Sequence, residues 1–248
     1  MSSTIFRRIL ALSTLPTDGL AEPSMKEERT GRTSHRTYGG ESPEERMARR
    51  RARFIEAGRA QFSQIGYRKT TMRSLCAEAG LTDRYFYESF ETIEDLLVAV
   101  YEELMGEMQA SIMAALQAAG PGQDADTLID IGLNAFFLQV EDSSTARVIW
   151  LEILGVNPRV DQIYNRGTRS FADLILMLSR TIAPQLTAQD DVARVVAMGM
   201  IGAASEAAKD WLMNDYQQPR EHLVQGIAMV FKGILQMIKT APAPTPAP

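Results

Sequence analysis

The stretch between Ser42 and Phe90 constrains the fold most, because helix start and stop signals follow one another there at short intervals. Ser42 followed by Pro43 is typical of a helix N-terminus. Glycine is typical of a helix end. Three helices are therefore predicted: one from Pro43 to Gly66, one capped by Thr70 or Thr71 that ends at Ala79, and one capped by Thr82 that runs to about Phe90. Because only Gly80-Leu81-Thr82 joins the last two, the pattern indicates a helix-turn-helix.

Beyond Phe90 the chain shows helical periodicity, and no run combines strand alternation with hairpin turns. Glycine and proline clusters such as Gly120-Pro121-Gly122 separate the helical runs. The predicted helical segments are 92–119, 124–140, 143–154, 158–183, 188–214 and 219–240. The chain is therefore predicted to be all-α.

The charge is divided unevenly along the chain. The net charge is −5, yet residues 44–90 hold ten Lys or Arg against six Asp or Glu. Residues 91–248 hold ten basic and twenty acidic side chains. A basic module followed by an acidic one favours contact between the basic part and nucleic acid.

The third predicted helix carries the side chains that would meet such a partner. In a helix-turn-helix the second helix of the pair enters the DNA major groove, and the preceding helix lies against phosphates. Arg84 can donate two hydrogen bonds to guanine, Asp83 can accept from cytosine, and Tyr85 can contact a thymine methyl. The Arg49–Arg53 run, with Arg68 and Lys69, would add sequence-independent attraction. The candidate DNA-binding residues are Thr71, Arg73, Thr82, Asp83, Arg84, Tyr85, Tyr87 and Ser89.

Residues 47–100 resemble the DNA-binding region of the TetR family of bacterial transcriptional regulators. The matching motifs are the aromatic-x-x-x-Gly-Tyr step at Phe62–Tyr67, the Thr70-Thr71 pair, Ala79-Gly80-Leu81-Thr82, and Phe86-Tyr87-x-x-Phe90. The resemblance implies a homodimer in which each subunit joins a three-helix DNA-binding domain to a helical ligand-binding domain. It also implies that the candidate residues from Arg73 to Ser89 touch DNA. The sequence departs from the family at Ile93, Ser89 and Glu88, and each departure reduces the expected contact with phosphate.

The acidic half offers apolar helices suited to a cavity and an interface. Thirteen methionines supply a flexible, polarizable filler, which suits an adaptable apolar pocket. The last helix has an apolar stripe at spacings of three and four, which predicts a homodimer through the last two helices. The same stripe could instead pack within its own subunit. The candidate ligand-binding residues are Met105, Phe137, Trp150, Tyr164 and Phe171.

These patterns predict a ligand-responsive DNA-binding regulator, expected to repress from a near-palindromic operator and to be released by a small apolar effector. The expected organisation is a flexible basic leader at 1–41, the helix-turn-helix DNA-binding domain at 42–91, the helical ligand-binding and dimerisation domain at 92–240, and a disordered tail at 241–248. The alternative is a helical scaffold whose helix-turn-helix does not read DNA.

An enzyme is not expected, because no nucleophile triad, phosphate loop or cofactor motif appears. Two His and one Cys cannot build a Cys/His zinc cluster, so no metal or cofactor is predicted. The apolar run near the start is too short to span a membrane, and no other run reaches about 18 apolar residues. A cytoplasmic protein without membrane contact is therefore expected.

Overall fold

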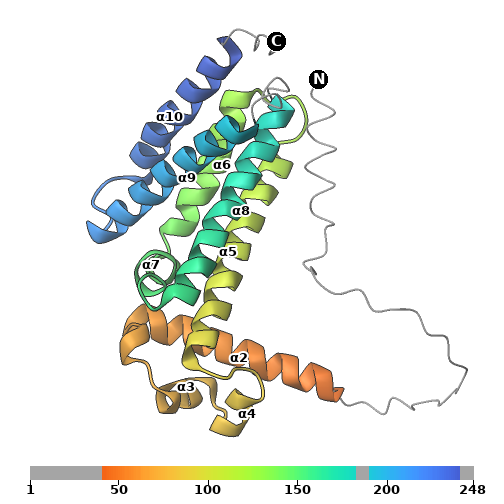
Figure 1. Cartoon of the computed structure of the whole chain (residues 1–248), viewed down its shortest axis with the longest axis vertical. Helices are drawn as coiled ribbons and strands as arrows, with labels where there is room; N and C mark the ends of the chain where they lie inside the picture. Colours follow the sequence, from red (N-terminus) through yellow and green to blue (C-terminus); the bar gives the residue numbers. More distant parts are fainter. Residues whose placement is uncertain (1–40, 183–189, 241–248) are drawn as a thin grey trace, which may run out of the picture.

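The structure is a computed structural model that describes residues 41–182 and 190–240, and within these ranges it contains helices and turns but no strand (Figure 1). The predicted all-α class is confirmed for that part of the chain. The predicted tail, and all of the predicted leader except Glu41, lie outside the described residues. The elements are α2 (Pro43–Gln64), η1 (Tyr67–Lys69), α3 (Met72–Ala79), α4 (Asp83–Tyr87), α5 (Ile93–Ala118), α6 (Ala125–Val140), α7 (Ser143–Arg147), η2 (Val148–Glu152), α8 (Pro158–Ile182), α9 (Asp190–Met213) and α10 (Arg220–Thr240).

Helices α2, α3 and α4 form a small unit, here called the head, at one end of the molecule (Figure 1). Ser42 and Glu45 close a capping box at the start of α2, and Gly80 ends α3 in the left-handed conformation at φ 60°. Phe54 of α2 and Phe86 of α4 meet edge to face at 5.2 Å in the core. The contact between Phe54 and Phe86 holds α4 against α2, and the turn at Gly80 sets the direction in which α4 leaves α3.

Two predicted helix ends differ from the structure. The third helix was predicted to reach Phe90, but α4 ends at Tyr87. The amides of Ser89 and Phe90 both donate to the Phe86 carbonyl at 2.9 Å, which tightens the chain into a turn and drives Phe90 into the core. The predicted helix at 143–154 begins as α7 and widens into the π-helix η2.

The remaining helices form the body, in which α5 rises from the head and packs along α6 and α8 (Figure 1). Gly167 of α8 lets that helix approach α5 closely, because a Cβ there would overlap the Tyr101 hydroxyl. Helix α10 packs against α6 and α9 at the outer edge. Trp211 and Tyr216 fasten the turn between α9 and α10, with the Tyr216 hydroxyl donating to the Val140 carbonyl at 2.9 Å.

Within the described ranges, α10 is the helix that is long and apolar enough, by length and composition, to cross a membrane. Ala228, Phe231 and Leu235 on one side of it are buried against the body. Its opposite side leaves Met229 and Met237 exposed to 71% and 73%. This apolar outer face needs an explanation that the single chain does not supply.

Candidate functional site

Helix α4 presents several candidate side chains at the free end of the head. The Arg84 side chain is 85% exposed and Tyr87 is 62% exposed. Thr82 and Asp83 are exposed beside them, and Asp83 Oδ1 accepts the Arg84 N–H at 2.8 Å. These four residues therefore form an exposed polar surface on α4 and at its start.

Tyr85 is held differently from its neighbours. The Arg50 guanidinium lies 3.8 Å above the Tyr85 ring, so one face of this half-buried ring is covered. Arg50 also pairs with Glu88 at 3.1 Å, while Arg84 approaches Glu88 at 3.6 Å. Glu88 therefore opposes the two nearest positive charges on this surface and orders them.

Three arginines of the run on α2 pack against other parts of the head, which their charge alone did not indicate. Besides Arg50 on Tyr85, the Arg51 guanidinium lies 4.4 Å over the Phe90 ring. The Arg53 guanidinium packs close to Gly80, because a Cβ added at Gly80 would lie 2.9 Å from Arg53 Nη2. These side chains hold α2 against Tyr85 of α4 and against the turns at Gly80 and Phe90, as well as carrying charge.

Ser89 does not fit the expected phosphate contact. Its Oγ is buried and finds no hydrogen-bond partner among the described residues. The tight turn after α4 rotates this side chain inward, so the exposed hydroxyl predicted from an uninterrupted helix is wrong for this structure.

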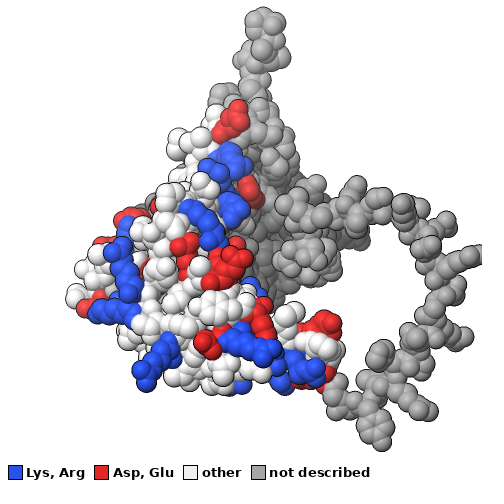
Figure 2. All heavy atoms as spheres, turned by 60° about the horizontal axis from the view of Figure 1, so that its bottom comes forward, with Lys and Arg blue, Asp and Glu red and all other residues white. Residues whose placement is uncertain are grey.

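Helix α3 begins with a side-chain cap beside exposed basic residues. Thr71 Oγ1 accepts the Ser74 N–H at 3.2 Å, and Thr71 itself is exposed. Arg73, Arg68 and Lys69 are exposed nearby. Figure 2 shows the head end of the molecule, where basic groups are interspersed with acidic ones. Exposed basic side chains thus lie around α3, and exposed polar side chains lie on α4.

Arg59 and Glu152 join the head to the body through polar contacts that the sequence did not indicate. Arg59 of α2 binds Glu107 at 3.0 Å and donates to Thr145 at 2.9 Å. Glu152 of η2 accepts the Tyr67 N–H at 2.8 Å. The partners lie 48 to 86 residues apart in the chain, so no local pattern could have indicated them.

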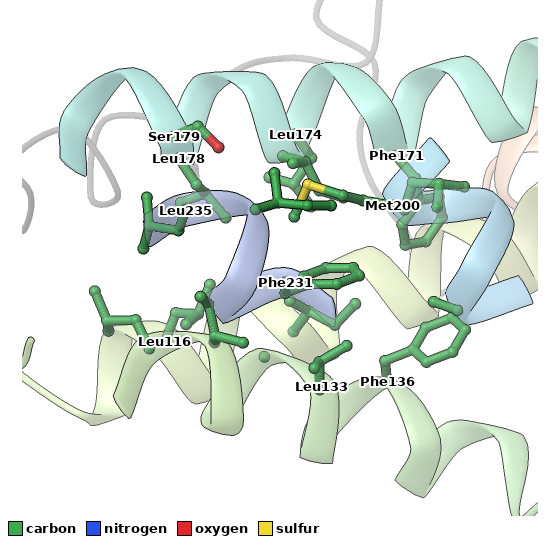
Figure 3. Close-up of a pocket in the computed structure, with 18 of the residues that line it drawn as sticks. Leu116, Leu133, Phe136, Phe171, Leu174, Leu178, Ser179, Met200, Phe231 and Leu235 are labelled. Atoms are coloured by element: carbon green, nitrogen blue, oxygen red, sulfur yellow. The ribbon is translucent and has the colours of Figure 1, made fainter. Parts of the chain in front are cut away.

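The body encloses an apolar cavity of about 140 Å³ between α5, α6, α8, α9 and α10. Side chains from these helices point toward a common interior, as Figure 3 shows for Leu116, Phe171, Met200 and Phe231. Ser179 is the single residue with a polar side chain among the described residues that line it. Such a lining binds hydrocarbon and offers almost nothing to a charged group.

The predicted ligand residues divide between this cavity and a smaller one. Phe171 lines the large cavity. It also lines a void of about 20 Å³ together with Met105, Trp150 and Tyr164. Phe136 and Ile201 line both spaces as well, so the small void lies directly beyond the wall of the large one.

Of the predicted ligand residues, Phe137 lies outside both of these spaces. It is fully buried against Trp211 and does not belong to the described lining of either space, whereas its neighbour Phe136 lines both. Adjacent helical residues point about 100° apart, and two apolar neighbours cannot be told apart by type.

The small void has a more polar wall than the large cavity. Tyr101, Tyr164, Thr168 and Ser205 bring hydroxyls to its lining. Burial raises the pKa of the Tyr101 phenol, with smaller contributions from Tyr164 and Glu102, so the group remains a hydrogen-bond donor. Its long contact to the Tyr164 carbonyl, at 3.4 Å, leaves the hydroxyl weakly satisfied.

Comparison with known proteins agrees with this geometry. Residues 54–100 match the family described as bacterial regulatory proteins, tetR family. The HTH-type transcriptional activator FasR of Mycolicibacterium smegmatis is 24% identical over 198 residues, which are 79% of this chain and 88% of FasR.

Solved structures share the fold. The fatty acid degradation regulator FadR from Bacillus halodurans superposes with a TM-score of 0.64 at 21% identity, covering 78% of this chain and 97% of FadR. FadR from Bacillus subtilis in complex with stearoyl-CoA gives a TM-score of 0.57 at 18% identity, covering 76% and 97%. The helix-turn-helix thus matches the tetR family of bacterial regulatory proteins over residues 54–100, and the helical body behind it shares the fold of these solved structures.

Proposed function

We propose that this protein binds duplex DNA as a homodimer through α4 and that an apolar effector in the body controls this binding. The observation that carries the proposal is the exposure of Arg84 and Tyr87 on the helix that follows the turn at Gly80. Arg84 would contact guanine in the major groove, while Lys69 and Arg73 beside α3 would lie against phosphates. The protein would then work in the cytoplasm, where the chromosome of a bacterium lies.

The outer face of α9 and α10 supports the dimer. Monomeric proteins rarely expose a large group of neighbouring apolar side chains, and the same face of a second copy would cover this one. Gly226 and Gly233 on α10 leave open space beside this face, which allows close helix approach. The exposed apolar residues of the two helices are Val192, Val195, Met213, Met229, Val230 and Met237. This explains the apolar surface of α10 without a membrane.

The effector class proposed is a long hydrocarbon chain such as a fatty acyl group. An almost wholly apolar lining suits a chain rather than a polar metabolite. The relatives support this choice, because FadR from Bacillus subtilis was solved with stearoyl-CoA. Whether DNA binding represses remains a prediction, since the FasR relative is named as an activator.

Binding to random-sequence duplex DNA at about 50 and 200 mM salt tests the DNA-binding proposal. We expect a steep loss of affinity with salt, and a slope lower by about 1 for each phosphate contact removed in Lys69→Ala and Arg73→Ala. Arg169→Ala, which removes an exposed arginine from α8 in the body, is the matched control and should leave the slope unchanged. Negligible affinity at both salt concentrations would favour the helical scaffold instead.

Thermal unfolding with stearoyl-CoA or stearate tests the effector proposal separately. A ligand at about 100 times its Kd stabilises the folded protein by about 2.7 kcal/mol. Leu174→Trp should fill the cavity and remove this stabilisation, because Leu174 lines it. If neither compound shifts the unfolding temperature of the wild-type protein, the acyl class is wrong.

A further inference from the structure

The π-helix η2 touches both the head and the inner end of the cavity, although it spans five residues. It begins where α7 ends, and the Ile153 N–H reaches back to the Val148 carbonyl at 3.3 Å, which closes the wider turn. Such widened turns recur at functional sites, because they change the direction of side chains along one helix. The two ends of η2 accordingly serve two different neighbours.

The last residue of η2, Glu152, contacts the head. Its side chain is 13% exposed, and its carboxylate accepts the Tyr67 N–H at 2.8 Å while Arg147 Nε lies 3.3 Å away. Gly66 precedes Tyr67 at φ +87°, and a Cβ there would lie 3.1 Å from Glu152 Oε2. The turn at Gly66 therefore favours glycine, and the Glu152 carboxylate accepts the amide N–H of the next residue, Tyr67.

The inner side of η2 faces the effector region. Ile149 and Trp150 are buried and line the small void next to the large cavity. Phe136, which lines both spaces, meets the Trp150 indole edge to face at 6.1 Å between centroids. A molecule that pushes past Phe136 would therefore press on Trp150, two residues before Glu152.

The segment from α7 to η2 holds the head at a second point as well. Arg59 of α2 donates to Thr145, which is 3% exposed, and lies 3.4 Å from Asp142, the residue that caps α7. Thr145 and Glu152 therefore both link this short stretch of the body to the head, in addition to the Arg59 contact with Glu107 of α5.

We propose that η2 transmits occupancy of the cavity to the head, and that Glu152 is the positioning residue through which it acts. Displacement of Trp150 would shift Glu152 away from the Tyr67 amide and release the turn at Gly66 from the body. The orientation of α2, and of α4 packed on it, would then change relative to the partner subunit. This mechanism rests on the proposed function, because it requires that an effector occupies the body and that the head binds DNA.

The first test compares the effect of stearoyl-CoA on DNA affinity in Glu152→Gln, Glu152→Ala and the wild-type protein. Coupling between two sites is typically about 5- to 150-fold. We expect the ratio of Kd values with and without stearoyl-CoA to fall in Glu152→Ala to less than about twofold, with Glu152→Gln intermediate because an amide oxygen still accepts the Tyr67 N–H. Glu103→Ala, which removes an exposed carboxylate from α5, should keep the wild-type ratio.

Binding of stearoyl-CoA itself, followed by thermal unfolding, should be the same in all four proteins. A wild-type ratio in Glu152→Ala with ligand binding intact would overturn the mechanism. If stearoyl-CoA does not bind the wild-type protein, it is the acyl class in the proposed function that fails, and a second test decides the mechanism without any ligand.

The second test imitates occupancy with Ser205→Leu, which adds bulk to the small void that Trp150 also lines. Ser205→Val is the milder companion if the larger residue prevents folding. We expect Ser205→Leu to change the DNA Kd in the wild-type background and to speed hydrogen exchange at the Tyr67 amide. The same substitution in the Glu152→Ala background should change the DNA Kd less than about twofold, because the two residues act on one path. Equal changes in both backgrounds, or a Tyr67 amide that exchanges at the wild-type rate, would refute the proposal.

Discussion

Substitution of Gly167 tests how closely α5 and α8 approach each other. A Cβ at this position would overlap the Tyr101 hydroxyl and lie 3.1 Å from Met105 Cε. Tyr101 is buried and cannot swing into solvent. Gly167→Ala would gain about 1 kcal/mol from helix propensity, while overpacking a filled interior costs about 1–3 kcal/mol. The net effect on the free energy of unfolding should therefore range from neutral to a loss of about 2 kcal/mol.

The matched control is Gly106→Ala on α5, where a Cβ would meet no described atom within 4 Å. This exposed site should show only the gain of about 1 kcal/mol. Chemical unfolding followed by circular dichroism should thus separate the two variants by about 1–3 kcal/mol. Tyr101→Phe removes the overlapping oxygen, so Gly167→Ala should cost less in that background. A Gly167→Ala variant as stable as Gly106→Ala would show that the two helices do not approach as described.

Three further predictions follow from the charges and hydroxyls. Burial tends to raise the pKa of Asp95, but hydrogen bonds from Arg159 and Thr92 outweigh it and hold the pKa below its usual value. Asp95→Asn should therefore lower the free energy of unfolding by about 1 kcal/mol at neutral pH, and this difference should vanish as acid unfolding is followed from about pH 4 downward. Burial raises the pKa of Tyr216 to about 12, so the hydroxyl stabilises the fold below its unfolded pKa of about 10. Tyr216→Phe should cost about 1 kcal/mol at pH 8 through the lost bond to the Val140 carbonyl, and heat denaturation should show this difference shrinking as the pH rises from about 10 to 12. Glu88→Gln should strengthen binding to random duplex DNA and steepen its salt dependence, because it removes the carboxylate beside Arg50 and Arg84; unchanged affinity would mean that Glu88 does not weaken the attraction.

The helix boundaries were predictable because capping is local. Ser42, Thr71 and Thr92 each accept a backbone N–H three residues ahead, and the signal lies within four residues of sequence. The spacing of four between Phe86 and Phe90 favours one shared face, and both side chains are buried. Local chemistry therefore located the helices of the head, α4 included.

The site details were not predictable, because they depend on contacts between distant parts of the chain. The Arg50 guanidinium, which covers the Tyr85 ring, pairs with Glu88 at a distance of 38 residues along the chain. The π-turn at η2 arises where a helical pattern continues without any breaking residue. The inward rotation of Ser89 follows from a turn that ends α4 early, although the sequence there contains no Gly or Pro. Residue types suggested which side chains could meet a partner, and only packing decided which of them are exposed.

Selection of bound duplexes from a random DNA pool tests the central claim most directly, with the wild-type protein and Arg84→Ala compared in parallel. A dimer that reads DNA with two α4 helices should enrich near-palindromic sites whose half-site centres lie about 10 base pairs apart, or a multiple of one turn. Arg84→Ala should lose preference at one position in each half-site, at a cost of about 1–3 kcal/mol there. A pool that stays random after selection, or an Arg84→Ala variant that enriches the wild-type sequences unchanged, would contradict the assignment of α4 as the helix that reads DNA.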